Sequence, residues 1–350
     1  MLSSLDVQEM KRIAQDSYTA AVERAFSQPG GVALRDLLEF LLVLYAHVEP
    51  ETISGTLYVT RRVDDESRLD DLIQGASSRS FRQVDRLPRS ITGVTVIDVQ
   101  DGVYRVWENV TFDAAAASSA AIVYRYMDRE EVFVINASTH RVRNPAPIHA
   151  SVFSRPTFSS VREALLDYRE TMVRTSFCFL LREVWEDETR RLFLRPKPEW
   201  IMRRSLHQFL RSSLRDASVR PEQVVDESHP VDLKVIFTPT TREAIIEIKW
   251  LGKSRRGRRV TASHTDRRAR DGAKQLADYL DATKQAAPDR QSRGYYVIID
   301  ARRQNLKPNT ITLSRADGMF FEQQEIRFNP EYHRIRDDYD PPIRMFVEPV

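Results

Sequence analysis

The sequence predicts an α/β protein in which an N-terminal α+β domain precedes a C-terminal mixed sheet flanked by helices. Apolar residues recur at helical spacing before residue 50 and again after residue 198. Alternating or wholly apolar runs, which are typical of strands, lie at 92–138, 229–250 and 294–300. After residue 191 the predicted order is helix, two antiparallel strands, helix and strand, an order that indicates a mixed sheet. We therefore expect one domain at 1–190 and a second at 191–350.

The composition is compatible with a two-domain globular protein. With 350 residues, 41% of them hydrophobic and 29% charged, the chain can form two domains with a sizeable core. The longest apolar stretch, 37–48, is too short to span a bilayer and contains Glu39, so it predicts a buried amphipathic helix. A single cysteine, Cys178, excludes an intrachain disulfide and favours a reducing compartment. Because the N-terminus also lacks a signal-peptide pattern, we expect a cytoplasmic protein with no membrane partner.

The first domain is expected to mix helices and strands. Helices are predicted at 5–29 and 33–48, separated by Pro-Gly-Gly, at 66–77, and after a proline-containing stretch at 160–186. Strands are predicted on both sides of Asp101-Gly102, a pair that favours a tight turn, and at 120–127 and 131–138. Its sequence matches no family that we recognise, and a sensor, regulatory or oligomerisation role stays open.

The second domain begins with a helix over 198–215. The elements expected after it are a hairpin at 229–250, a basic loop at 251–270, a helix at 271–285, a strand at 294–300 and two edge strands within 320–328 and 343–350.

The hairpin carries three charged residues where a strand should be apolar. Alternation along 243–250 puts Glu247 and Lys249 on one face, and a turn near residue 239 would place Asp232 opposite 247–248. Neighbouring carboxylates repel unless a cation neutralises them, and two carboxylates with a backbone carbonyl suit Mg²⁺. A lysine beside the ion can help to deprotonate a bound water or stabilise charge on a phosphate. The alternative is a salt-bridged trio without a metal.

The order of these residues resembles the signature of the PD-(D/E)XK nuclease superfamily. Asp232 is followed fifteen positions later by Glu-x-Lys on an apolar strand, although Pro230 and Asp232 are separated by one inserted residue. Gln275 and Tyr279, four residues apart and opposite the apolar side of their helix, resemble the Q-x-x-x-Y helix of RecB-like members. The resemblance covers roughly residues 195–305.

This resemblance implies a restriction-endonuclease-like fold and metal-dependent hydrolysis of phosphodiester bonds. The implied metal is Mg²⁺, for which Mn²⁺ can substitute. The implied ligands are Asp232, Glu247, the Ile248 carbonyl and Glu199, the one acid suitably placed on the preceding helix. The alternative for Glu199 is a favourable interaction with the helix dipole in the first turn, without a metal. The implied catalytic set is Asp232, Glu247, Lys249, Gln275 and Tyr279, of which the last two would support the site or touch the nucleic-acid backbone.

A basic cluster next to the hairpin predicts contact with phosphates. Residues 251–270 hold eight Lys and Arg against one acid, and no aromatic side chain interrupts the cluster. The residues expected to bind nucleic acid are Lys253, Arg255, Arg256, Arg258, Arg259, Arg267, Arg268 and Lys274. Backbone contacts are expected rather than base contacts. A solvated loop is the alternative.

The sequence thus predicts a nuclease, and the resemblance favours DNA over RNA and, by analogy, a prokaryotic anti-phage defence or restriction-type effector. A catalytically inactive nucleic-acid-binding or scaffold protein with the same fold is the alternative, and a homo-oligomer stays open. The 11 glycines form no phosphate-binding loop and the seven histidines show no zinc spacing. His229 and His264 flank the predicted site and are interpreted as surface residues.

Overall fold

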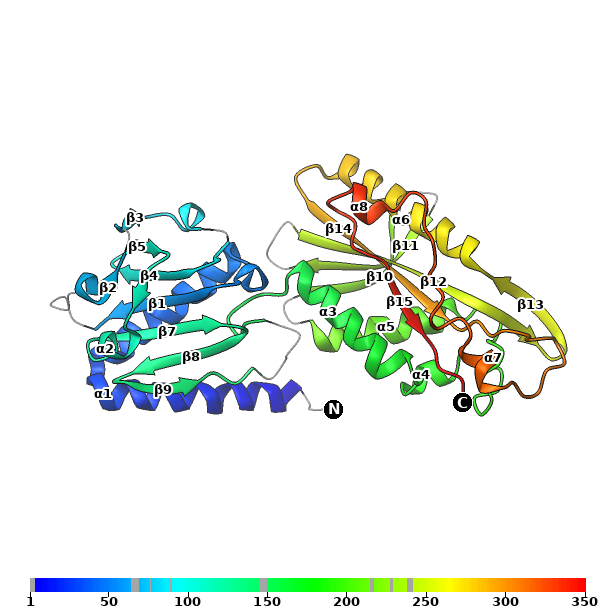
Figure 1. The fold of residues 1–350 in the computed structure, drawn as a ribbon, viewed down its shortest axis with the longest axis horizontal. Helices are drawn as coiled ribbons and strands as arrows, with labels where there is room; N and C mark the ends of the chain where they lie inside the picture. The colour runs from blue at the N-terminus through cyan, green and yellow to red at the C-terminus, as the bar shows by residue number, and fades with distance from the viewer. Residues whose placement is uncertain are drawn as a thin grey trace. The chain divides into compact units, whose positions relative to one another are not determined.

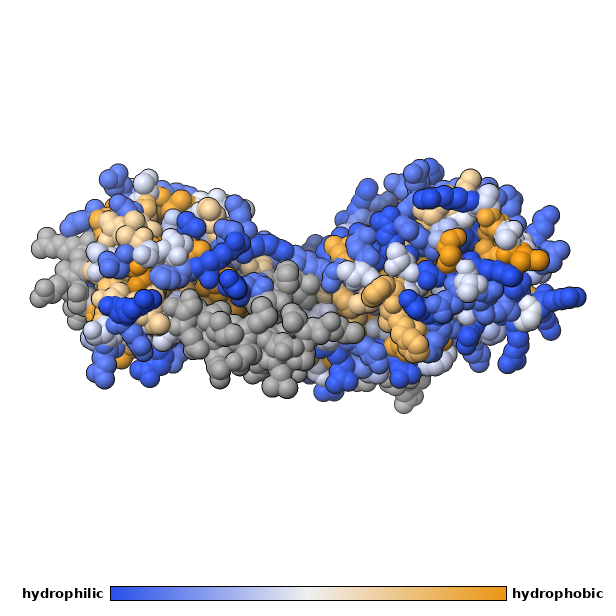
Figure 2. All heavy atoms as spheres, turned by 90° about the horizontal axis from the view of Figure 1, so that it is seen from below, coloured by the Kyte–Doolittle hydropathy of each residue, from blue (hydrophilic) through white to orange (hydrophobic). Residues whose placement is uncertain are grey.

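The protein is a mixed α/β structure with two compact units, Met1–Arg155 and Pro156–Val350 (Figure 1). The computed structural model describes residues 4–63, 69–75, 77–88, 90–144, 150–214, 217–226, 229–237 and 242–350. No helix among these residues combines the length and the apolar character that crossing a bilayer requires. On the face drawn in Figure 2, the described residues expose mostly hydrophilic side chains, and the hydrophobic ones lie in small groups.

The first unit is built on a seven-stranded sheet in the order β3-β5-β4-β1-β7-β8-β9. All neighbours pair antiparallel except β1 and β4, which are parallel. Its strands are β1 (Thr56–Arg62), β3 (Arg79–Phe81), β4 (Val94–Gln100), β5 (Val103–Glu108), β7 (Ala121–Met127), β8 (Glu130–Ile135) and β9 (Ser138–Arg141). A separate small sheet pairs β2 (Ile73–Gln74) with β6 (Thr111–Phe112). The helices are α1 (Ser4–His47) and α2 (Ala114–Ala117), with 3₁₀ turns at Pro50–Thr52, Leu69–Leu72 and Val84–Arg86.

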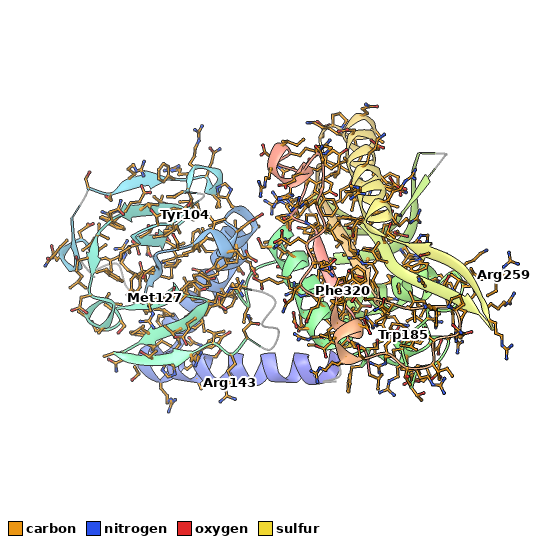
Figure 3. The ribbon with its side chains drawn as sticks, turned by 45° about the vertical axis from the view of Figure 1, so that its right-hand side comes forward. Tyr104, Met127, Arg143, Trp185, Arg259 and Phe320 are labelled. Carbon is orange, nitrogen blue, oxygen red and sulfur yellow. The ribbon has the colours of Figure 1, made fainter. Side chains whose placement is uncertain are left out.

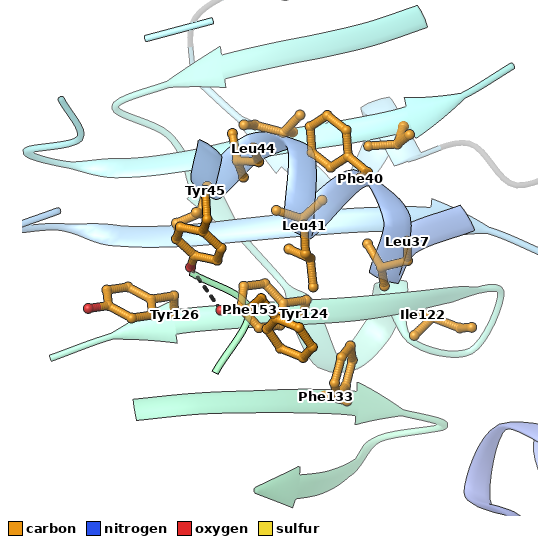
Figure 4. Close-up of a cluster of buried hydrophobic side chains, with 14 of the residues drawn as sticks. Leu37, Phe40, Leu41, Leu44, Tyr45, Ile122, Tyr124, Tyr126, Phe133 and Phe153 are labelled. Carbon is orange, nitrogen blue, oxygen red and sulfur yellow. Dashed lines mark hydrogen bonds between the residues drawn. The ribbon is translucent and has the colours of Figure 1, made fainter. Parts of the chain in front are cut away.

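Helix α1 covers one face of this sheet. Leu37, Leu41 and Leu44, spaced three and four residues apart, are fully buried against strand residues such as Tyr124 (Figure 4). The Tyr45 hydroxyl hydrogen-bonds the Tyr124 hydroxyl at 2.8 Å within this core. A smaller apolar cluster that includes residues of β4, β5 and α2 forms a second core in the unit.

Most of the elements predicted for this unit are present. Asp101 and Gly102 have φ values of 49° and 73°, so the predicted turn between β4 and β5 is confirmed. Two N-terminal helices are present as predicted, but the break between them lies at the non-helical Ser27 and not at Pro-Gly-Gly, since Pro29 lies inside the helix. The helix predicted over 66–77 is wrong: in its described part a 3₁₀ turn at Leu69–Leu72 leads directly into β2.

The second unit contains a six-stranded mixed sheet in the order β10-β11-β12-β14-β15, with β13 paired to the end of β12. The strands are β10 (Ala217–Asp226), β11 (His229–Phe237), β12 (Arg242–Arg256), β13 (Arg259–His264), β14 (Gln291–Asp300) and β15 (Ile343–Phe346). β10, β11 and β12 are antiparallel, whereas β12, β14 and β15 are parallel. The helices are α3 (Phe158–Tyr168), a π-turn at Arg169–Val173, α4 (Phe179–Arg182), α5 (Glu199–Ser213), α6 (Asp266–Ala286), α7 (Arg315–Met319) and α8 (Tyr332–Ile335).

Helices flank this sheet on both faces. Adjacent residues of β14 show this, because consecutive side chains of a strand point to opposite faces. The Tyr296 hydroxyl donates to the Ala269 carbonyl of α6 at 2.8 Å, whereas the Tyr295 hydroxyl donates to the Phe158 carbonyl of α3. Helix α5 joins the α3 side, since the Tyr168 hydroxyl donates to the Ser205 hydroxyl at 2.8 Å.

The boundary between the units lies at 155/156 rather than at the predicted 190/191. The segment 156–190, which the sequence analysis assigned to the first domain, packs in the second unit. The Phe158 ring meets the Phe237 ring edge-on at 5.5 Å, and Trp185 is 1% exposed. The composition change near residue 191 therefore falls within the second unit, before α5.

Of the two edge strands predicted in the tail, only β15 forms. Residues 320–328 contain no strand. Their backbone carbonyls are used differently, because the Arg344 guanidinium donates to the carbonyls of Phe321, Glu322 and Gln324. An arginine side chain thus satisfies acceptors that a strand ladder would otherwise satisfy.

Candidate active site

Asp232 and Glu247 lie on neighbouring strands, as the sequence predicts. The printed register of β11 and β12 ends at Leu233 with Ile246, directly before these two acids. The two carboxyl groups are close, because the charge of Asp232 raises the pKa of Glu247. The Asp232 carboxylate accepts a hydrogen bond from the Ile248 amide at 2.8 Å. The side chain of Asp232 thereby takes the place of a backbone acceptor where the ladder ends. The turn predicted near residue 239 lies outside the described residues.

Glu247 and Lys249 are two residues apart on β12 and share this face. The Lys249 ammonium donates to Glu247 Oε1, and both residues are buried, with Glu247 only 1% exposed. Among the described residues nothing hydrogen-bonds the other carboxylate oxygen, Oε2, although that atom is buried. A buried carboxylate oxygen without a partner is costly, so it indicates a group that the protein chain alone does not provide.

The pKa values of both site acids are raised, chiefly by burial. Burial, and then the charge of Asp232, raise the pKa of Glu247 to about 8, although Lys249 and Arg268 partly offset the rise. Burial also raises the pKa of Asp232, against the lowering effects of the Ile248 amide and nearby cations. Two carboxyl groups with raised pKa values on adjacent strands are typical of a functional site.

Helix α6 covers the site at Gly272, a residue that was not predicted from sequence to belong to it. A Cβ atom on Gly272 would lie 2.5 Å from Lys249 Cγ and 2.5 Å from the Tyr296 hydroxyl. The helix therefore packs directly on the lysine stem, and only glycine fits. Glycine inside a helix costs about 1 kcal/mol relative to alanine, and this unfavourable choice within 271–285 was the available sequence signal.

Gln275 and Tyr279 are both brought to the site, but not as an exposed pair. The Gln275 amide nitrogen donates to the Tyr279 hydroxyl, and Tyr279 is buried with Leu276 and Leu280. The prediction that Tyr279 lies opposite the apolar face is therefore wrong, because the apolar stripe of α6 is wide enough to include it. Burial raises the pKa of Tyr279 to about 12, and the charges of both site acids add to the rise.

Glu199 does not join the two acids. It pairs with Arg268 at 3.1 Å, and no three acidic, histidine or cysteine side chains of the described residues gather as a metal cluster. One turn later on α5, Arg203 pairs with Asp232 at 3.2 Å. The prediction of Glu199 as a ligand is thus not supported, since its carboxylate is engaged by Arg268 and α5 directs an arginine to the acids. Arg203 was not singled out for this role from sequence.

The oxygen atoms of the two acids could coordinate a divalent ion that also keeps several water ligands. Among the described residues Glu247 Oε2 has no hydrogen-bond partner. The oxygens of Asp232, each with two lone pairs, accept from Arg203 and from the Ile248 amide. Two carboxylates and one main-chain carbonyl form a hard-oxygen set of the kind that Mg²⁺ accepts.

The basic segment is a hairpin and not the predicted loop. β12 and β13 pair as far as Arg256 with Arg259, around a turn at Gly257 with φ 58°. Two of its predicted nucleic-acid contacts point to the protein: Lys253 donates to the Leu306 carbonyl, and Arg255 lies over the Phe193 ring. Arg255 also pairs with Glu186 at 2.5 Å, so these two predictions are not supported.

The other predicted basic residues remain on the surface. Arg259 extends outward near the tip of the hairpin (Figure 3). Those that are exposed are Arg256, Arg258, Arg259, Arg267 and Lys274, whereas Arg268 is partly buried beside Glu199. His264 packs against Trp250, with ring centroids 4.3 Å apart, and burial lowers the pKa of this histidine. The side chain of His229 lies outside the described residues.

Comparison with models of known protein families, with curated proteins and with solved structures finds no match for this chain.

Proposed function

We propose that the second unit is a metal-dependent nuclease with a restriction-endonuclease-like fold of the PD-(D/E)XK superfamily. The observation that carries this proposal is the buried Glu247 carboxylate. One of its oxygens receives Lys249 and the other has no partner among the described residues, while Asp232 lies close to it on the neighbouring strand. A divalent cation at this point would supply a partner for the unsatisfied oxygen.

The carboxylates of Asp232 and Glu247, with the Ile248 carbonyl, would hold Mg²⁺ or Mn²⁺. Such an ion makes bound water a better nucleophile and offsets charge on a phosphate. Lys249, whose ammonium already lies against Glu247, is the side chain that would stabilise charge developing on the scissile phosphate. Gln275 and Tyr279 would be positioning residues, since Tyr279 is buried near both acids and accepts a hydrogen bond from Gln275.

Nucleic acid would reach the site along exposed cations. Arg256, Arg258 and Arg259 on the hairpin, with Arg267 and Lys274 on α6, suit contacts to phosphates rather than to base edges. DNA is preferred over RNA as the substrate because of the resemblance of the motifs, which also favours a defence or restriction-type effector. The first unit would then serve as a sensor, regulatory or oligomerisation part of the same chain.

Cleavage assays with Lys249→Ala test the proposal. Labelled duplex DNA, single-stranded DNA and RNA are incubated with the whole chain in Mg²⁺, Mn²⁺ or EDTA. We expect cleavage only with a metal, and a loss of at least about 100-fold in turnover for Lys249→Ala with binding nearly unchanged, because its charge acts in the transition state. Lys253→Ala is the matched control, since Lys253 lies on the same strand but donates to the Leu306 carbonyl. Equal turnover in Lys249→Ala and the native chain would reject the proposal.

A non-cutting nucleic-acid-binding or scaffold protein is the second candidate, and one observation favours it. Arg203 pairs with Asp232 and Lys249 with Glu247, so two cations match two acids without a metal. Thermal melting separates the candidates. At a hundredfold excess over its dissociation constant, a bound ion adds about 2.7 kcal/mol of stability, or roughly 5–10 °C in Tm for a unit of this size. The scaffold candidate requires no Mn²⁺-dependent shift.

A further inference from the structure

Trp200 is an exposed aromatic residue at the start of α5. All four tryptophans of the chain lie among the described residues, and three of them are at most 4% exposed, whereas Trp200 is 51% exposed. Large aromatic side chains are mostly covered in folded proteins, and exposed ones recur at binding surfaces.

The neighbours of Trp200 on the helix link it to the acid pair. Arg203 and Arg204 lie three and four residues further along α5, so the three side chains share one face, with about 5–6 Å between Cβ atoms. Arg203 reaches Asp232 at 3.2 Å, and Arg204 is exposed. The indole therefore lies one helical turn from a cation that touches the candidate active site.

Charge at this end of α5 suits a polyanion. Residues 195–204 contain four basic side chains and one acid, Glu199, whose charge is compensated by Arg268 at 3.1 Å. Arginine guanidinium groups bind phosphate oxygens, and a flat indole offers a surface for a base. A base can stack on it only when that base is unpaired or unstacked, because both faces of a base inside a duplex are covered by neighbouring bases.

We propose that Trp200 is a stacking platform for an unpaired base of single-stranded nucleic acid, whose phosphates are held by Arg203 and Arg204. This inference rests on the proposed nuclease function and names the form of its substrate. The strand end or unwound segment would then be presented to the acid pair from the α5 side.

The iodide-accessible part of the intrinsic fluorescence reports on Trp200, because the other three tryptophans emit but are buried away from the quencher. The whole chain is titrated in EDTA with oligodeoxythymidine of about 16 nucleotides, the upper end of known single-strand site sizes. Iodide quenching without DNA first establishes the emission of the exposed indole. We expect the oligonucleotide to quench that emission and to protect it from iodide, whereas a blunt hairpin duplex of equal phosphate number has little effect.

Three variants define the role of the ring. Trp200→Ala should weaken single-strand binding, measured by anisotropy of labelled DNA, by roughly 5- to 150-fold, the range for losing one stacked base. Trp200→Phe keeps a ring and should retain most of the affinity while losing the fluorescence change. Phe179→Ala is the matched control: Phe179 is 74% exposed, but it follows Cys178, which contacts Ser205 on the other side of α5. The Phe179→Ala variant should bind single-stranded DNA with unchanged affinity.

The outcomes separate this inference from the proposed function. Cleavage of DNA with no change in Trp200 emission would overturn the stacking role alone. Quenching and a Trp200→Ala defect without any metal-dependent cleavage would leave the stacking role in place and reject the nuclease. Equal quenching by the blunt duplex would overturn the preference for unpaired bases. An emission change that follows protein concentration without DNA would assign the indole to self-association instead.

Discussion

Glu247 occupies the least favourable environment of any residue in the candidate active site. It lies in the middle of a strand between Ile246 and Ile248, and its side chain is 1% exposed. Among the described residues, Lys249 donates to one carboxylate oxygen of Glu247, and the other oxygen has no hydrogen-bond partner. A buried acid that served stability alone would be replaced by an apolar residue at little cost, so its presence favours a functional role.

Arg203 pairs with Asp232, so its guanidinium lies beside the carboxylate that would bind the metal ion. We predict that Arg203→Ala binds Mn²⁺ about tenfold more tightly than the native chain, a gain of about 1.4 kcal/mol, because a like charge is removed from beside the ion. Isothermal titration calorimetry measures this affinity without any turnover. The variant should also have a lower metal-free Tm, since Asp232 loses its ion pair.

The adjacent Arg204 provides the control for that experiment. It is exposed and lies on the next position of the same helix, so Arg204→Ala should change neither the Mn²⁺ affinity nor the metal-free Tm by a measurable amount. An affinity for Mn²⁺ that is weaker in Arg203→Ala than in the native chain would show that Arg203 supports metal binding rather than opposing it.

Glu131 predicts a pH dependence in the first unit. It is 2% exposed and accepts hydrogen bonds from Tyr124, Ser151 and the Val152 amide. Burial raises its pKa, and these hydrogen bonds lower the pKa by less than burial raises it. The folded state therefore holds the proton more tightly than the unfolded state, whose glutamate pKa is about 4.3. Its contribution to stability is fully present below that pH and is lost as the pH rises through the folded-state value.

Glu131→Gln should remove this dependence. The amide introduces a hydrogen-bond mismatch that does not change with pH, so the stability of the native chain minus that of the variant should fall as the pH rises above about 4.3. Thermal melting at a series of pH values gives this difference. A difference that stays constant from pH 4 upward would contradict the raised pKa.

At the scale of elements, strand β12 carries both the site residues Glu247 and Lys249 and one half of the basic hairpin. This hairpin, residues 252–264 of β12 and β13, is called the basic arm below. Its central part pairs with β11 and β14 in the sheet, and its last residues leave the sheet to pair with β13. The register shift between Ser254 and Arg255 lies where the arm begins. Such irregularities increase the local bend and twist of a strand, which directs the arm away from the sheet.

Replacing Arg256, Arg258 and Arg259 by serine tests whether this arm binds phosphates. Each neutralised phosphate of duplex DNA contributes about 0.9 to the slope of log affinity against log salt, so the slope should flatten by up to about 3 units. Fluorescence anisotropy at several salt concentrations measures the slope, and different DNA sequences should behave alike. Arg255→Ala should leave the slope unchanged and lower the Tm, because Arg255 contacts Glu186 and Phe193. An unchanged slope in the triple variant would make the arm a solvated hairpin.

The elements that the sequence predicts correctly are those whose pattern is local. Alternation alone is enough to put Glu247 and Lys249 on one face of β12, and apolar spacing is enough to delimit α5. β10 escaped prediction because Pro221 and polar residues interrupt it, which an edge strand tolerates. The absence of a strand at 320–328 depends on Arg344, some twenty residues away.

In the candidate site too, local patterns were predictable from sequence and contacts between elements were not. The acids and the lysine were predictable, whereas the choice of Arg203 over Glu199 as the residue that reaches Asp232 depends on how α5 is rotated against the sheet. Both residues fit the sequence pattern of the helix equally well. Packing between elements, which no local pattern records, decides between them.

At the scale of the whole molecule, the two units have separate cores. The main apolar cluster of the first unit combines α1 with its own sheet, and that of the second combines α6 with β12 and β14. Every residue of the candidate active site belongs to the second unit. Each unit therefore meets the first requirement for independent folding, a core of its own.

A pair of truncations tests where the catalytic unit begins. We predict that the fragment 156–350 melts cooperatively and shows the same Mn²⁺-dependent rise in Tm as the whole chain, whereas the fragment 191–350 does not fold. The shorter fragment loses the Tyr168 hydrogen bond to Ser205, the buried Trp185, and the Arg174 carbonyl that accepts from the Glu348 amide at 2.7 Å. Losing one large buried aromatic side chain alone costs about 3–5 kcal/mol, a large part of the stability of a typical domain. The fragment 1–155 is the control and should melt without responding to Mn²⁺. Cooperative melting of 191–350 with an unchanged Mn²⁺ response would instead show that the segment 156–190 is dispensable to the site, and that the change in composition near residue 191 does mark the functional boundary.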